Sequence, residues 1–225
     1  MRKALKNSVV SIVGARREPE KRPDVPYRLV FVTSGTTLAS SSNIGYYNNF
    51  VTNAANAVPD LAKLNATWTV IGSTGTTNAI TNIGASLATV GIYDLTGTLV
   101  ANGTSGLFSG SLLAPIDTTE LGQTAPVLDP NFPGYVWTGS TENGRKGADP
   151  LGTGSSGNIG LDTATSSQWI YYGYLSGQAE STVPLPVYAI SSEINTVPEP
   201  GTTGLTVLGG TILLLAGRRK AQART

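Results

Sequence analysis

The chain of 225 residues contains no cysteine and no histidine. Without cysteine there are no disulfides and no thiolate nucleophiles, and without histidine there is no imidazole base and no imidazole ligand for zinc. Several classes of enzyme and the usual zinc sites are therefore excluded. The lack of disulfides does not indicate a compartment, because an exported chain can rely on a sufficiently large core. We expect no catalytic residue, no metal ligand and a protein that is not an enzyme.

Charged residues are also scarce, at 13% of the chain against about 25% in ordinary domains. They are distributed unevenly, because seven of the fifteen basic residues lie in residues 1–22 and four in residues 218–225. Between residues 23 and 197, four basic residues face eleven carboxylates, which gives a net charge of −7. Nucleic-acid binding needs the opposite sign. We expect no nucleic-acid partner.

Residues 1–26 form a basic leader. Arg2, Lys3 and Lys6 have the character of the positive start of a secretory signal. The apolar stretch that follows, residues 9–15, is short and is interrupted by a serine and a glycine. Three alternatives stay open: a marginal export signal, a start codon assigned at the wrong position, and an unstructured basic segment.

Residues 197–225 combine three features in order: a proline-rich box, an uncharged apolar run over residues 205–216, and a basic cluster. The apolar run is shorter than the ~20 residues that a transmembrane helix prefers, so it predicts a short membrane segment. The positive-inside rule then keeps the basic cluster in the cytoplasm and places the preceding chain outside. A buried C-terminal helix with a solvated basic end is the alternative. The box is Val197, Pro198, Glu199 and Pro200, and the cluster is Arg218, Arg219 and Lys220.

This arrangement resembles the PEP-CTERM sorting signal that exosortases recognise. The resemblance implies an exosortase as partner and cleavage near residues 198–200. It also implies that the apolar segment tethers the chain to the inner membrane only transiently, as a GPI signal is lost from its mature protein. The destination it implies is the cell surface or the extracellular matrix.

Residues 27–196 show the patterns of an α+β domain. Residues 27–33 are apolar on both faces, which predicts a central strand. Apolar residues recur at three- and four-residue steps from Ile44 to Val58, which predicts an amphipathic helix that ends before Pro59. We also predict a helical turn at residues 61–64, strands at 67–71, 135–139, 168–172 and 187–190, a hairpin at 92–100 that turns near Gly97, and a long loop at 140–166.

The order of these elements resembles that of an endostatin-like, C-type-lectin-like domain of bacterial surface proteins. The resemblance implies a single domain of that fold with long loops, while the ligand chemistry does not carry over with it. The disulfides of the animal members and the Ca²⁺-binding Glu-Pro-Asn loop of sugar-binding lectins are both missing. The motifs that carry the resemblance lie at residues 27–33, 68–74, 78–79, 93–97, 107–110, 114–116, 136–139, 143–144, 169 and 187–189.

Aromatic and polar side chains in the second half of the chain are candidates for ligand binding. Aromatic rings can stack on sugar rings, and nearby amide or carboxylate groups can contact the hydroxyls. Burial in the core is the alternative for the tryptophans. The candidates are Trp137 and Trp169, with Tyr171, Tyr172 and Tyr174 as further rings, and Asn143 and Asp162 as polar partners.

No cofactor is expected, and Ca²⁺ is the only metal for which suitable side chains gather. Residues 152–157 match the letters G-x-G-x-x-G, but no strand and helix flank them as a dinucleotide site requires. Ca²⁺ binds six to eight oxygens, although glycine-rich turns favour Asp and Asn in any case. The oxygens are those of Asp129, Asn131, Glu142, Asn143, Asp149, Asn158 and Asp162.

These patterns predict an exported surface or biofilm-matrix protein that acts as a structural or interaction module. An exopolysaccharide is the expected partner, because the resemblance to the sorting signal implies co-occurrence with exopolysaccharide systems. A carbohydrate-binding, lectin-like module is the alternative. A polysaccharide hydrolase is a weaker one, because it needs two suitably spaced carboxylates and the sequence pairs none.

Overall fold

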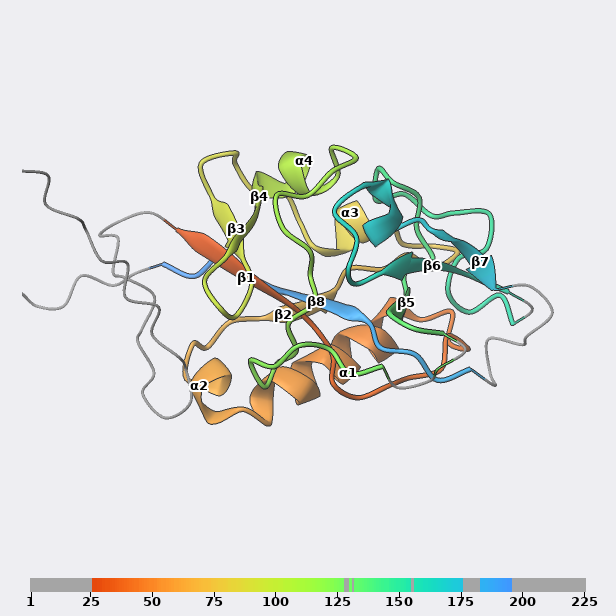
Figure 1. Cartoon of the computed structure of the whole chain (residues 1–225), viewed down its shortest axis with the longest axis horizontal. Helices are drawn as coiled ribbons and strands as arrows, with labels where there is room; N and C mark the ends of the chain where they lie inside the picture. The colour runs from red at the N-terminus through yellow and green to blue at the C-terminus, as the bar shows by residue number, and fades with distance from the viewer. Residues whose placement is uncertain (1–25, 128–129, 131, 155, 176–182, 196–225) are drawn as a thin grey trace, which may run out of the picture.

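The computed structural model describes residues 26–127, 130, 132–154, 156–175 and 183–195. They form a five-stranded sheet of order β2-β8-β1-β3-β4 and a three-stranded sheet of order β5-β6-β7 (Figure 1). Short helices are mixed with largely antiparallel strands, so the predicted α+β class is confirmed. The elements are β1 (Tyr27–Val32), α1 (Ile44–Asn56), α2 (Pro59–Ala62), β2 (Trp68–Val70), α3 (Ala79–Asn82), β3 (Gly91–Tyr93), β4 (Leu99–Asn102), α4 (Gly103–Leu107), β5 (Tyr135–Trp137), β6 (Gly157–Leu161), the 3₁₀ helix η1 (Ser167–Trp169), β7 (Gly173–Leu175) and β8 (Tyr188–Ser191).

Strand β1 is the centre of the larger sheet, as its apolar sequence predicts. It pairs in parallel with β3 and antiparallel with β8. Because successive side chains of a strand point to opposite faces, Val30 and Val32 pack in one core cluster and Phe31 in the other. All three are fully buried. The sheet therefore separates two hydrophobic cores.

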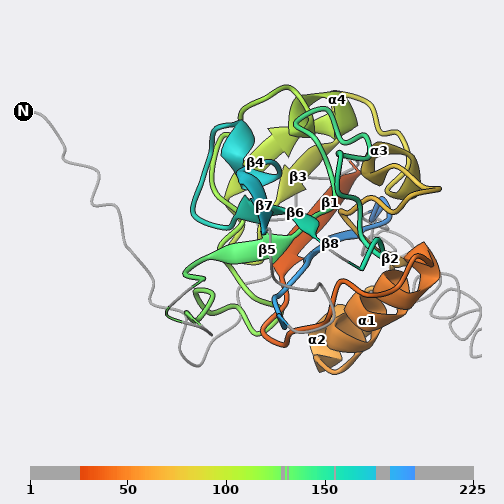
Figure 2. The ribbon, with the colours of Figure 1, turned by 90° about the vertical axis from the view of Figure 1, so that its right-hand side faces the viewer.

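Helix α1 covers one face of this sheet, whereas α3 and α4 lie on the other (Figure 2). The predicted periodicity is confirmed, since Tyr47, Val51 and Ala55 are the buried residues of the helix. The side chain of Asn43 accepts a hydrogen bond from the backbone N–H of Gly45 at 2.9 Å. The first turn is thereby capped, and α1 ends before Pro59 as expected.

Replacing Asn43 with alanine is expected to lower the free energy of unfolding by about 1 kcal/mol, the typical value of an N-cap. Asn43→Ser is the matched control, because its hydroxyl can still accept the bond and should restore most of the loss. Urea denaturation followed by tryptophan fluorescence measures both variants. Equal losses in the two variants would show that the cap contributes nothing.

The two ends of the described domain lie beside each other. The N–H of Tyr27 donates to the Ile194 carbonyl oxygen at 3.1 Å, and the N–H of Ile194 donates to the Tyr27 carbonyl oxygen at 2.8 Å. Strand β8, just before Ile194, lies between β2 and β1 and pairs antiparallel with both. The chain therefore enters and leaves the domain at the same end of the two neighbouring strands β1 and β8.

Two sequence predictions in the second half of the chain are wrong. Residues 168–172 were expected to form a strand, but Trp169 ends the short helix η1 and its ring is buried in the core cluster. Residues 140–166 were expected to form one long loop, but they contain β6. Its sequence, rich in glycine, has low strand propensity, and pairing with β5 and β7 on either side stabilises it instead.

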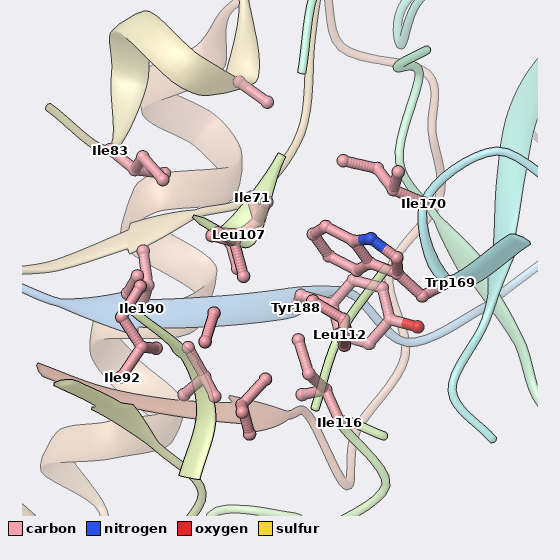
Figure 3. Packing of buried hydrophobic residues seen from close by; sticks show 14 of the residues in the cluster. Ile71, Ile83, Ile92, Leu107, Leu112, Ile116, Trp169, Ile170, Tyr188 and Ile190 are labelled. Atoms are coloured by element: carbon pink, nitrogen blue, oxygen red, sulfur yellow. The ribbon is translucent and has the colours of Figure 1, made fainter. Parts of the chain in front are cut away.

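The core on the α3 and α4 side is built around two aromatic rings, which Figure 3 shows with the aliphatic residues packed about them. The ring centroids of Trp169 and Tyr188 are 5.6 Å apart, and Phe108 stacks on Trp169 at 6.1 Å. Ile71, Leu107 and other aliphatic side chains complete the cluster. In the described part of the chain, no helix has the length and apolarity that crossing a bilayer requires.

Candidate functional site

A small hollow lies beside the three-stranded sheet. The room it offers to a water-sized group is about 10 Å³, far below the roughly 300–1,000 Å³ of pockets that enclose small molecules. It can therefore receive one group of a larger ligand and cannot enclose the whole ligand. We name it the Asp162 hollow; it is lined by Pro126, Phe132, Gly134, Tyr135, Asp162, Leu185 and Pro186.

Pairing of β5 with β6 brings Asp162 to this position. Tyr135 is the register partner of Leu161, and the next N–H, that of Asp162, donates to the Gly134 carbonyl oxygen at 2.9 Å. Gly134 has φ +72°, and a Cβ there would lie 2.6 Å from Asp162 Oδ1. Glycine therefore adopts the positive φ of this turn without strain and leaves room for the Asp162 carboxylate.

The Asp162 carboxylate is poorly compensated. The residue is 5% exposed, and Oδ1 has no hydrogen-bond partner among the described residues. Burial raises its pKa to about 6, the charge of Asp117 adds to the rise, and backbone N–H groups of Thr163 and Asp162 oppose it. Ionised Asp162 therefore costs stability at neutral pH.

The Tyr188 hydroxyl and Trp169 Nε1 are among the other buried polar atoms that lack hydrogen-bond partners within the described ranges. Burial raises the pKa of Tyr188 well above its usual value, and the charges of Asp162 and Asp117 raise it further. Figure 3 shows Tyr188 and Trp169 together in the core. The poorly compensated Asp162 carboxylate thus acts on Tyr188, whose buried hydroxyl also lacks a hydrogen-bond partner within the described ranges.

A row of three aromatic rings begins at the Asp162 hollow, which Phe132 and Tyr135 line, and continues to Tyr172, which does not line it. The ring centroids of Phe132 and Tyr135 are 5.8 Å apart, and those of Tyr135 and Tyr172 are 5.6 Å apart. Tyr172 is 45% exposed. Burial raises the pKa of Tyr135, as do the charge of Tyr172 and a hydrogen bond with its side chain. We call Phe132, Tyr135 and Tyr172 the aromatic row.

The structure separates the four principal candidate residues. Trp137 and Trp169 are both fully buried, and Trp137 Nε1 donates to the Val183 carbonyl oxygen at 3.0 Å. Their faces belong to the core and are not open to a ligand. Asn143 is exposed in a turn, where its Oδ1 accepts from the Thr141 hydroxyl at 3.4 Å, and it does not line the Asp162 hollow. Asp162 does.

The three rings of the aromatic row were only partly predicted from the sequence. Tyr172 was named among the candidate rings, whereas Tyr135 was placed in a predicted strand without a role and Phe132 was missed. The missing signal is strand pairing, because Tyr135 and Asp162 become neighbours only when β5 and β6 are aligned. Tyr171 is also exposed, at 40%, and nothing is described for the side chain of Tyr174.

The proposed Ca²⁺ oxygens do not gather in the described part of the chain. No group of three or more acidic residues there could hold a metal ion. Asp149 accepts a hydrogen bond from the Ser156 hydroxyl, and buried Asn158 accepts from the Asp149 N–H at 3.0 Å and donates to the Gly173 carbonyl oxygen at 3.3 Å. These residues fasten loops to strands. The glycine-rich pattern at residues 152–157 leads into β6 and not into a helix.

Several predictions concern residues outside those described. They include the basic leader, Asp129, Asn131 and the whole C-terminal segment with its box, apolar run and basic cluster. Comparison of the chain with protein-family models and with curated proteins gives no match. Any function is therefore argued from the residues and the geometry above.

Proposed function

We propose that this is an exported surface or biofilm-matrix protein that an exosortase processes at its C-terminus and that acts as a structural or interaction module. The observation that carries the proposal is the ordered C-terminal sequence, in which Val197–Pro198–Glu199–Pro200 precedes an apolar run and Arg218–Arg219–Lys220. Two closely spaced prolines keep a cleavage site extended and unpaired. The apolar run then holds the chain at the inner membrane until cleavage.

The fold is consistent with such a role. We propose an endostatin-like, C-type-lectin-like domain, which the central position of β1, the long helix α1 and the many loops support. Its stability needs no disulfide, because two hydrophobic cores lie on opposite faces of the larger sheet. The acidic middle of the chain, with a net charge of −7 between residues 23 and 197, is unsuited to binding nucleic acid.

Carbohydrate binding is the second candidate function. The specific observation that favours it is the aromatic row next to Asp162, a carboxylate that lacks a partner for one oxygen within the described residues. A matrix protein that holds exopolysaccharide needs such a surface.

Replacing Pro198, Glu199 and Pro200 together with alanine is expected to abolish processing in the native cell. The parent should be extracellular and lack everything after about residue 200, whereas the variant should keep its tail and remain in the membrane. Intact-mass measurement of fractionated cells gives both results. Thr202→Ala with Thr203→Ala, in the spacer, is the matched control and should be processed normally. Full-length cytosolic protein in all three strains would overturn the proposal.

A further inference from the structure

The Asp162 hollow and the aromatic row together have the features of a ligand site. Asp162 is 5% exposed and lines the hollow, yet its Oδ1 lacks a hydrogen-bond partner among the described residues. Structural carboxylates at such depth are normally paired or fully hydrogen-bonded. A hydrogen-bond donor supplied by a ligand would complete this one.

The aromatic row determines the shape of the ligand. Its rings follow one another at 5.8 and 5.6 Å with tilts of 45° and 52°, so neighbouring rings are in contact and their faces are inclined to one another. The side chain of Tyr172 is 45% exposed, so this end of the aromatic row is accessible to a ligand from solvent. Aromatic faces of this kind bind ligands that combine an apolar face with polar edges, and a pyranose ring, with axial C–H groups and equatorial hydroxyls, has this form.

The negative charge around the Asp162 hollow determines which pyranoses can bind there. The hollow contains Asp162 with Asp117 acting on it through space, and the chain from residue 23 to residue 197 carries a net charge of −7. A uronate or sulfated sugar would be repelled both by the Asp162 carboxylate and by the net negative charge of residues 23–197. Hydroxyl donors, in contrast, suit an acceptor that has no partner.

We propose that the aromatic row and the Asp162 hollow bind a neutral pyranose glycan, with a sugar ring stacked on the exposed ring of Tyr172 and one edge of that sugar toward Tyr135. One hydroxyl enters the hollow and donates to the Asp162 carboxylate, directly or through one bridging water. The hollow has room for one water-sized group, so it takes a single hydroxyl while the rest of the glycan lies on the surface beside it. The inference deepens the proposed function, because it names the glycan class that such a matrix protein would hold.

The test is calorimetric titration of the full chain with cellohexaose, a neutral oligosaccharide whose hydroxyls are all equatorial. We expect saturable binding that Tyr172→Ala weakens at least fivefold. Tyr171→Ala is the matched control, since Tyr171 is the adjacent residue and similarly exposed but is not in the row; it should change the dissociation constant less than twofold. Asp162→Ala should also weaken binding, and it should fold, because removing an uncompensated buried charge does not destabilise the domain.

Three results would overturn the inference: no binding at 10 mM cellohexaose, equal weakening by the two tyrosine variants, or tighter binding of polygalacturonate than of cellohexaose. Tail processing is measured separately in the native cell. Normal processing without glycan binding would refute this inference alone, and glycan binding without processing would refute the sorting proposal alone.

Discussion

Gly160→Ala is expected to prevent the domain from folding. A Cβ at this position would lie 2.0 Å from the Trp169 carbonyl oxygen and 2.7 Å from its carbonyl carbon. Both are backbone atoms, so no side-chain rotation can relieve the contact, and β6 is held on both sides by β5 and β7. Trp169 is fully buried and cannot move without opening the core. We expect a loss of at least about 4 kcal/mol of unfolding free energy, at the upper end of single substitutions.

The control is Gly173→Ala in the neighbouring strand β7. No atom lies within 4 Å of a Cβ built at Gly173, so this substitution should change stability by less than about 1 kcal/mol. Near-ultraviolet circular dichroism reports on the packing of the buried tryptophans, and urea denaturation measures the unfolding free energy of both variants. A Gly160→Ala variant with parental stability would mean that β6 and η1 do not approach as described.

Asp162→Asn is expected to stabilise the protein at pH 8 by up to about 3 kcal/mol, because a pKa shift from 3.8 to about 6 corresponds to about 1.4 kcal/mol per unit. The sign follows from proton binding. Between pH 3.8 and about 6 the unfolded chain releases the Asp162 proton while the folded chain keeps it, so stability falls as pH rises. The penalty is complete above pH 6 and absent below pH 3.8.

Urea denaturation of the parent and the variant at pH 4, 6 and 8 measures this effect. The difference in unfolding free energy should grow from near zero at pH 4 to its full value at pH 8. Glu142→Gln is the matched control: it also removes one carboxylate charge, but Glu142 is exposed in a turn, so no such pH-dependent gain is expected. A constant difference at all three pH values would contradict the assignment to ionisation of Asp162.

The first half of the fold was predictable because its signals are local. The helical spacing that begins at Ile44, the apolar strand β1 and the turn at Gly97, which has φ +88°, each depend on neighbouring residues in the chain. In the second half, β5 and β8 lie where local patterns predict strands, whereas β6 and η1 depend on distant contacts. Strand β6 is paired with β5 and β7, and Gly160 leaves room for the Trp169 backbone; no local pattern indicates either contact.

The candidate site shows the same division. Asp162 could be named from composition as a loop carboxylate, but its burial and its neighbour Tyr135 follow from strand register. The two tryptophans were attractive as sugar platforms because large rings dominate binding surfaces. Rings of that size also release the most free energy when buried, and in this domain both are in the core.

The position of β8 between β2 and β1 has a mechanical consequence. A protein that is held by its C-terminal side while its surface grips another polymer is under tension, and the force enters the domain through Ile194 and then β8. Since β8 is hydrogen-bonded on both sides, pulling it out requires two ladders to break, whereas an edge strand would peel away from one. The strand nearest the C-terminal end of the described domain is therefore among those best placed to bear load.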